Sequence, residues 1–346
     1  MVPKKQQSLA IGIAALLAFA LAACGQESHK PGSTPSLTIA LASVASDVPN
    51  RIALEKGLFE KHGVKVTLDE NVGQNVPSVV ASGRADLGVY SLGGPASLAA
   101  KGQKVSVLYD LGAGSGSGSV LVDAHSKVKT LDELHGCTMV TQATGTASYG
   151  NARRYNADQK LGCKVSPLAD PAAQIGAVVS GHADAIVGTL SNYAAAIKEG
   201  KLKVIVDTAK PTDQAKYVNP NYPLVILFGR KDKIAEKEKA LTAYFQALDE
   251  ATQVFKDSSD QEVAQIVKGE SAYKGMSVDQ VAASVKDFRA SFQIASDAGL
   301  ITASQWQDAL DAMSLFGIPG LDVHNSALSY DNIVDPKPLE NARKAS

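Results

Sequence analysis

The sequence predicts an α/β fold of two lobes, and three observations support this prediction. First, a turn-and-strand pattern occurs twice: residues 79–91 read VVASGRADLGVYS, and residues 177–189 read AVVSGHADAIVGT, 98 positions later. Second, short apolar runs typical of buried strands alternate with helical patterns from Ser36 to Val206. Third, the chain beyond residue 228 shows helical spacing. The alternative is that Ser-Gly-x-Ala-Asp is only a common helix-to-strand turn.

In the first half of the chain, strands and helices are expected to follow each other at short intervals. The expected strands are residues 37–42, 64–69, 86–90 and 105–111, and the expected helices are residues 49–62, 75–82 and 94–101. Runs that are apolar on both faces are typical of a parallel sheet covered by helices. A glycine-serine run, residues 112–119, then fails the dinucleotide-binding fingerprint, because Ser117 stands where the third glycine belongs. We expect this run to form a hinge or a turn that lines a cleft.

A second series of the same kind follows the glycine-serine run. The expected strands are residues 119–122, 138–141, 164–168, 183–187 and 203–206, and the expected helices are residues 131–135, 147–161, 172–180 and 191–198. The chain then recrosses in a strand at residues 224–228. The helices expected beyond it include one with an apolar face from Leu241 to Phe255 and others at residues 260–268, 277–291 and 303–316. We expect Trp306 and Met313 to lie in the core rather than in a site.

These patterns predict the domain organisation. Lobe 1 is expected to be discontinuous, built from residues 36–118 plus 222–346, with lobe 2, residues 119–221, inserted within it. Residues 24–35 are polar with proline and glycine, which is typical of a flexible tether.

The first 23 residues have the pattern of an export signal. Lys4 and Lys5 precede an uncharged, mostly apolar run, residues 8–23, which is shorter than the roughly 20 residues that span a bilayer. The run ends in Leu-Ala-Ala before Cys24 and resembles the lipobox of bacterial lipoproteins. This resemblance implies cleavage before Cys24 and an acylated, membrane-anchored sulfur. The alternative is an ordinary secretory signal followed by an incidental cysteine.

Cys137 and Cys163 are the two remaining cysteines, and each precedes a predicted strand. Cysteine pairs outside the cytoplasm usually form disulfides. Adjacent parallel strands would bring the two residues within bridging distance. We therefore predict a disulfide, the alternative being two buried free thiols. Pro167 suggests that the second of these strands lies at a sheet edge.

Hydroxyl residues gather at 144–148, between a predicted strand and the next helix. Such residues cap a helix start, whose free N–H groups attract an anion or a carbonyl oxygen. Gly145 and Gly150 have the spacing of a P-loop, but Asn151 replaces the required lysine, which argues against nucleotide hydrolysis. The alternative is a plain helix cap. Ser91 and Thr189 end the two repeats, at the strand ends where open α/β sheets bind ligands.

Composition and motifs argue against several classes of function. The net charge is −1 and no basic run exceeds two residues, so no nucleic-acid partner is expected. There is no G-x-S-x-G, no H-E-x-x-H and no paired-cysteine metal knuckle, so we expect no catalytic residues, no metal and no cofactor. The histidines are expected to be solvated; they are His29, His62, His125, His135, His182 and His324.

Three stretches of the sequence resemble a known family of proteins. Residues 53–64 read ALEKGLFEKHGV, residues 82–86 contain Ser-Gly-x-Ala-Asp, and residues 131–140 read LDELHGCTMV. These stretches resemble the sulfonate, nitrate and thiamine-precursor (taurine-like) family of periplasmic binding proteins. The resemblance implies a type II-like two-lobed fold and a monomeric, non-enzymatic receptor that delivers a small molecule to an ABC transporter permease. The contact loops of the family fall on Ser43, Ser46, Asp47, Gln74, Ser91, Thr144, Gly145, Thr146, Ser148 and Thr189.

The ligand is expected to be a small organic solute of the sulfonate, carboxylate or pyrimidine-like class. No Arg or Lys lies inside the contact loops, and the nearest cations, Arg51 and Arg153, are on predicted helices. This argues against a strongly charged oxyanion, although helix N-termini alone can hold one. The expected location is the cell envelope, on the outer face of the cytoplasmic membrane or in the periplasm. Alternatives are a lipid-anchored sensor and an enzyme of thiamine-precursor synthesis on the same fold.

Overall fold

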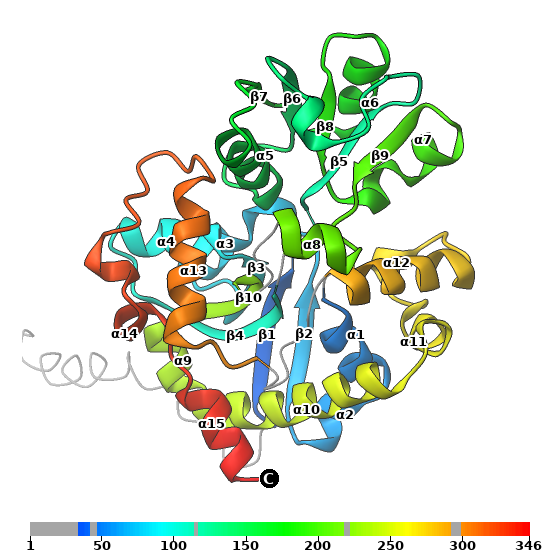
Figure 1. Cartoon of the computed structure of the whole chain (residues 1–346). Helices are drawn as coiled ribbons and strands as arrows, with labels where there is room; N and C mark the ends of the chain where they lie inside the picture. Colours follow the sequence, from blue (N-terminus) through cyan, green and yellow to red (C-terminus); the bar gives the residue numbers. More distant parts are fainter. Residues whose placement is uncertain (1–33, 42–46, 114–116, 218–221, 292–298) are drawn as a thin grey trace, which may run out of the picture. The chain divides into compact units, whose positions relative to one another are not determined.

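A computed structural model shows the chain as two sheets with helices on their faces (Figure 1). The structure describes residues 34–41, 47–113, 117–217, 222–291 and 299–346. The chain divides into two compact units, Met1–Thr34 and Pro35–Ser346, and every element below belongs to the second unit.

The first sheet has five strands in the order β2-β1-β3-β10-β4 (Figure 1). They are β1 (Ser36–Leu41), β2 (Lys65–Asp69), β3 (Leu87–Ser91), β4 (Val105–Ala113) and β10 (Pro223–Arg230). β1 runs parallel to β2 and β3, whereas β10 lies antiparallel between β3 and β4. Both faces of β1 are covered, since Leu37 and Ile39 pack in one hydrophobic cluster and Ala40 packs in another.

The second sheet repeats this plan in the order β7-β6-β8-β5-β9. Its strands are β5 (Ser119–Asp123), β6 (Thr138–Thr141), β7 (Lys164–Pro167), β8 (Ala185–Gly188) and β9 (Leu202–Val206). β6 runs parallel to β7 and β8, and β5 lies antiparallel between β8 and β9. β7, which carries Pro167, is an edge strand as predicted.

The two sequence repeats occupy equivalent places, because β3 and β8 are each third in their sheet. Gly83 and Gly181, in the turns before these strands, both have φ of 76°, a left-handed conformation that glycine adopts without strain. The repeat is therefore a structural repeat and not merely a common turn.

The aspartate of each repeat forms hydrogen bonds to the backbone of the neighbouring parallel strand. Asp86 Oδ2 accepts a hydrogen bond from the Thr38 N–H at 2.9 Å, and the Asp86 N–H donates to the Thr38 carbonyl at 2.9 Å. Asp184 and Thr138 form the same reciprocal pair, at 2.7 and 2.9 Å. Each aspartate thus satisfies a backbone donor at the start of a parallel strand pair, which fixes the register.

Helices cover both faces of the first sheet. On one face lie α1 (Val48–Glu55), α2 (Leu58–Lys61), α9 (Lys231–Glu236), α10 (Glu238–Asp257), α11 (Asp260–Val267), α12 (Val278–Ser291) and α15 (Lys337–Lys344), with the 3-10 turn η5 (Ser271–Tyr273). On the other lie α3 (Val76–Ala81), α4 (Gly93–Ala100), α13 (Ala303–Ser314) and α14 (Tyr330–Ile333), with the 3-10 turn η6 (Ser326–Leu328). Trp306 and Met313 are buried there, so the prediction that they belong to the core is confirmed.

The second sheet also has a cluster of side chains on each face. α5 (Ala147–Asp158) packs on one face, with a neighbouring 3-10 turn, η3 (Leu131–Glu133). α6 (Pro171–Val179), η4 (Leu190–Tyr193) and α7 (Ala194–Lys198) contribute to the other. After β9, α8 (Pro211–Tyr217) leads back toward β10.

Some predicted elements were wrong in detail. The single helix expected at residues 49–62 is two helices, α1 and α2, because Gly57 has φ of 64° and interrupts the helix. The helix expected at 131–135 is only the 3-10 turn η3, and α8 was not predicted. The lobe boundaries at residues 118–119 and 221–222 remain a prediction, because residues 35–346 form one compact unit.

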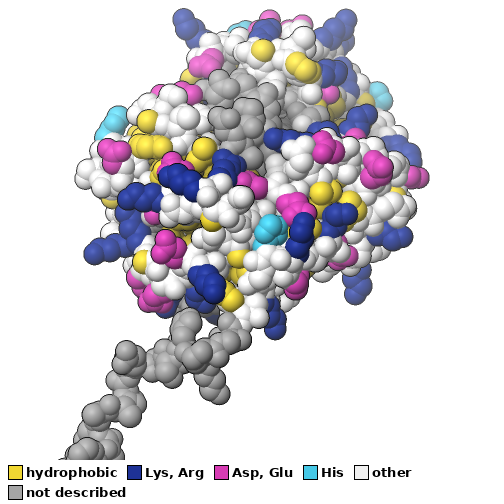
Figure 2. Space-filling model, turned by 90° about the horizontal axis from the view of Figure 1, so that it is seen from below, with side chains coloured by type: hydrophobic (Ala, Val, Ile, Leu, Met, Phe, Trp, Pro, Cys, Tyr) yellow, Lys and Arg dark blue, Asp and Glu magenta, His cyan; other side chains and the backbone are white. Residues whose placement is uncertain are grey.

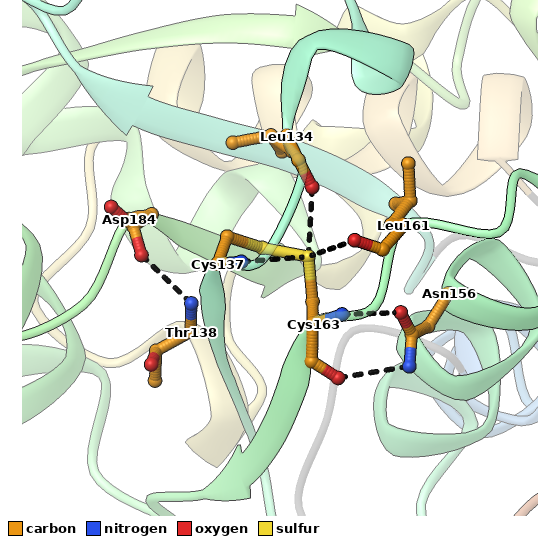
Figure 3. The surroundings of a disulfide bond; sticks show 7 residues. All are labelled: Leu134, Cys137, Thr138, Asn156, Leu161, Cys163 and Asp184. Atoms are coloured by element: carbon orange, nitrogen blue, oxygen red, sulfur yellow. Dashed lines mark hydrogen bonds between the residues drawn. A yellow bond between two sulfur atoms is a disulfide. The ribbon is translucent and has the colours of Figure 1, made fainter.

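The disulfide between Cys137 and Cys163 joins the starts of β6 and β7 (Figure 3). The strands are parallel with Thr138 opposite Lys164, so the preceding cysteines are opposite each other, with their Cα atoms 4.4 Å apart. Asn156 of α5 donates to the Cys163 carbonyl at 2.9 Å and accepts from its N–H at 2.7 Å (Figure 3). The predicted pairing is confirmed, and its surroundings also fix α5 to the strand.

Candidate functional site

The loop between β6 and α5 carries four of the predicted site residues: Thr144, Gly145, Thr146 and Ser148. Thr146 is the N-cap of α5, and its hydroxyl accepts a hydrogen bond from the Tyr149 N–H at 3.4 Å. The Ser148 hydroxyl, which is buried, lies 3.1 Å from the Thr146 hydroxyl. The cap is therefore as predicted, and a pair of hydroxyl groups lies at the first turn of the helix.

One donor of this loop is already in use. The Gly145 N–H donates to the carbonyl of Phe316 at 2.7 Å. Gly145 has φ of 87°, a conformation that favours glycine. The amides of Ala147 and Ser148 have no partner within the helix, because the first N–H groups of a helix lack an acceptor one turn earlier. These two amides are the donors that the first turn can offer to a bound group.

Ser91 is the last residue of β3 and is half-buried, paired in register with Val225 of β10. The segment that follows it approaches the 144–148 loop. A Cβ atom placed on Gly93, the first residue of α4, would lie 3.3 Å from the Gly145 carbonyl oxygen. Residues that follow β3 of the first sheet and β6 of the second therefore meet.

Thr189 occupies the N-cap position of η4 directly after β8, without a capping side-chain hydrogen bond, and is half-buried. Its hydroxyl lies 3.0 Å from the hydroxyl of Ser117, in the glycine-serine run between the sheets. The next residue of that run, Gly118, accepts a 2.7 Å hydrogen bond from the Tyr155 hydroxyl of α5. The end of the second repeat is thus joined to the connection between the two sheets.

Asp47 is the N-cap of α1 and is buried, with a relative exposure of 2%. Its Oδ1 accepts from Asn50 Nδ2 at 2.6 Å, and Oδ2 has no hydrogen-bond partner among the described residues. Burial raises the pKa of Asp47 to about 7, although the Arg51 guanidinium and the Asn50 bond act in the opposite direction. Of the predicted site residues that the structure describes, Asp47 carries the one ionisable side chain.

Arg51 is fully buried and is held by two carboxylates rather than facing a loop. It donates to Glu70, which follows β2, and to Glu270 at 2.9 Å, which precedes η5. Burial raises the pKa of Glu270 to about 7. No local pattern in the sequence indicates this ion-pair network, because its members come from three separate segments of the chain.

Three predicted site residues are not described with side chains. Ser43 and Ser46 lie outside the described residues, and only the backbone of Gln74, in η2 (Gly73–Asn75), is described. Whether they meet the other site residues stays a prediction.

Within the described parts of the chain, no group of three or more His, Cys, Asp or Glu side chains is arranged to hold a metal ion. The same residues include no helix long and apolar enough to cross a bilayer. On the face drawn in Figure 2, basic side chains lie among acidic ones rather than in one continuous basic patch.

The family model described as NMT1/THI5 like matches residues 48–262, which is more than half of the chain. The chain belongs to the NMT1/THI5-like family. The matched residues of this NMT1/THI5-like protein include both structural repeats and the loop from β6 to α5. Among curated proteins, none is a significant match in sequence.

Solved structures with the same fold include two solute-binding proteins and one enzyme. The periplasmic aliphatic sulphonate-binding protein SsuA from Escherichia coli is 20% identical with a TM-score of 0.64, over 82% of this chain and 87% of that chain. The periplasmic nitrate-binding protein NrtA from Synechocystis PCC 6803 is 14% identical with a TM-score of 0.66, over 90% and 89%. The desulfurization enzyme DSZB is 12% identical with a TM-score of 0.61, over 90% and 99%.

These likenesses establish the α/β fold of periplasmic binding proteins for this NMT1/THI5-like chain. They do not establish a function, since the same fold occurs both in binding proteins and in an enzyme.

Proposed function

We propose that the chain is the extracytoplasmic solute-binding lipoprotein of an ABC importer. The observation that carries the proposal is the approach of Gly145, after β6, to Gly93, after β3: segments from the two sheets meet just beyond the carboxyl ends of their strands. A receptor that closes on its ligand needs contacts from both sides, because a ligand shifts an equilibrium only through interactions that are better in one state. Family membership and the fold support the same proposal.

The solute would bind through hydroxyl and amide groups. We assign it to Ser43, Ser46, Asp47, Gln74, Ser91, Thr144, Gly145, Thr146, Ser148 and Thr189. Arg51 is engaged by Glu70 and Glu270, and Arg153 is exposed on α5. The described side chains therefore favour a small polar solute held mainly by hydroxyl and amide groups, of the sulfonate, carboxylate or pyrimidine-like class.

A panel of three compounds, one from each proposed class, tests this proposal: ethanesulfonate, propionate and 4-amino-5-hydroxymethyl-2-methylpyrimidine. Thermal unfolding and calorimetry should show that at least one of them binds. A compound at about 100 times its Kd should add roughly 2.7 kcal/mol to the free energy of unfolding. Turnover of a panel compound, in place of stoichiometric binding, would contradict the proposal and favour the enzyme.

The likeness to DSZB is the observation that favours an enzyme as the second candidate. Against it, the described histidines with side-chain partners bond outside the site loops: His62 to Glu250, His125 to Asp123 and His182 to Ser180. Cys137 and Cys163, the cysteines in the described residues, are joined to each other. A lipid-anchored sensor would share the binding step, and a permease and an ATPase encoded beside this chain would separate importer from sensor.

We also propose that the mature protein is attached to the cell envelope through an acyl chain on Cys24. The motive is the lipobox at the end of a short apolar run. Cys24→Ser should shift the protein from the membrane fraction to the soluble fraction, or leave it unprocessed. Gln26→Ser, two residues further along in the predicted tether, is the matched control, since it places the same residue type nearby and leaves Cys24 intact. Unchanged fractionation and lipid labelling of Cys24→Ser would contradict the anchor.

A further inference from the structure

The turn after α13, residues 315–318, touches both segments that are proposed to bind the solute. The Phe316 carbonyl accepts the Gly145 N–H at 2.7 Å, in the loop before α5. The Ile318 side chain lies between the two segments: its Cδ1 is 2.8 Å from a Cβ position on Gly93, and its Cγ1 is 3.5 Å from one on Gly145. One turn from the C-terminal part of the chain therefore connects segments that follow β3 and β6.

This close approach is possible because glycines, which have no Cβ atom, stand at the points of contact. A Cβ on Gly150, in the first turn of α5, would lie 2.2 Å from Cδ1 of the Phe316 ring. A Cβ on Gly317 would lie 2.7 Å from Cε1 of Tyr149, and Gly317 has φ of 64°. Together with Gly93, these are three glycines on three segments, each at a position where a Cβ would collide.

The turn is fixed from behind by the core of the first sheet. Phe316 has a relative exposure of 1% and packs in one cluster with Trp306 and Met313 of α13. Ala147, the first residue of α5, belongs to the same cluster, although the rest of α5 packs on the second sheet. The start of α5 thus packs against buried side chains of the first sheet's hydrophobic core.

We propose that Phe316 and Ile318 are positioning residues for solute binding, because they hold the 144–148 loop in place beside Gly93, two residues after Ser91. The proposal rests on the proposed function. It also changes which donors the solute meets: the Gly145 N–H is taken by Phe316, which leaves the Ala147 and Ser148 amides and the hydroxyl groups.

The test uses Gly150→Ala, with Gly176→Ala as its matched control. Both replace a glycine inside a helix that packs on the second sheet, and alanine favours a helix over glycine. The added methyl collides with Phe316 at position 150 but meets nothing within 4 Å at position 176. Emission of Trp306, the one tryptophan of the chain, reports whether the α13 core stays intact.

Hydrogen exchange of the Gly145 amide should become at least tenfold faster in Gly150→Ala and stay unchanged in Gly176→Ala. This measurement needs no ligand, so it decides the contact even if the proposed function fails. Equal exchange in the parent and in Gly150→Ala would overturn the proposal.

Affinity for the compounds of the panel should fall at least fivefold in Gly150→Ala and in Ile318→Ala, a half-buried position whose truncation should not unfold the chain. Faster exchange with unchanged affinity would overturn the positioning role. If the parent binds none of the panel, the proposed function fails, and exchange alone decides whether the turn holds the loop.

Discussion

At the residue scale, two buried carboxyl groups are the most unusual feature. Asp110 of β4 has a relative exposure of 1%; its Oδ1 accepts from the Gly112 N–H at 2.9 Å, while Oδ2 has no partner among the described residues. Burial raises its pKa to about 7, as it does for Asp47. Neither group is matched by enough donors to stay charged at low cost, so both retain protons that an exposed carboxyl would release.

These carboxyls predict that the protein loses stability as the pH rises from about 4 to 7. In this window the folded state binds more protons than the unfolded state, so the free energy of unfolding falls, by up to about 1.4 kcal/mol per pH unit for each group. Urea unfolding at several pH values measures the slope. Asp110→Asn, which keeps the Oδ1 acceptor, should flatten it, whereas Asp158→Asn, at an exposed position, should not. An unchanged slope in Asp110→Asn would contradict the assignment.

The second prediction at this scale concerns the hydroxyl groups of the site. Thr189→Ala and Ser148→Ala should each weaken solute binding several-fold, because losing one neutral hydrogen bond costs about 0.5–1.5 kcal/mol. Calorimetry with a panel compound that binds the parent measures the effect, and Thr242→Ala on α10 serves as a control outside the site. Binding like that of the parent in both variants would mean that the site lies elsewhere.

At the element scale, the sequence predicted what local patterns determine. The strands of both repeats, the α5 cap at Thr146 and the edge position of β7 all follow from short-range rules of turns, caps and proline. The pairing of Cys137 with Cys163 followed from two strand starts and a compartment argument.

Contacts between distant segments could not be predicted in the same way. Arg51 gives no local sign that it pairs with Glu270, 219 positions away. Phe316 was expected only as the last residue of the helix at residues 303–316, and nothing local indicates the hydrogen bond between its carbonyl and the Gly145 N–H. Gly150 carried a signal, since glycine inside a helix often marks a close approach, but its spacing was interpreted as part of a failed P-loop.

The disulfide that joins the starts of β6 and β7 should stabilise the folded protein. The disulfide closes a loop with a sequence separation of 26, and in the chain-entropy model its removal should lower the free energy of unfolding by roughly 3 kcal/mol. Cys137→Ser/Cys163→Ser, compared with the oxidised parent in urea, measures this difference. Thiol reagents that label both cysteines in the untreated native protein would instead contradict the bond.

At the scale of the whole molecule, the two sheets differ in whether their strands come from one continuous part of the chain. The five strands of the second sheet lie together between Ser119 and Val206. The first sheet is interrupted: β10, from Pro223 to Arg230, lies between β3 and β4, which precede the second sheet in the chain. The second sheet is therefore continuous in sequence, and the first is not.

Because β10 comes late in the sequence, the first sheet lacks one strand while the chain is being synthesised. β4 ends at Ala113 and β10 begins at Pro223, so a ribosome that adds about 5–20 residues per second needs about 5–20 seconds to deliver the missing strand. Until then the facing edges of β3 and β4 are unpaired, and such edges attract other strands. A chain that ends at residue 217 and has been released from the ribosome should therefore contain a protease-resistant second sheet and a first sheet that is digested and bound by chaperones. Equal resistance of both would show that β1–β4 close without their fifth strand.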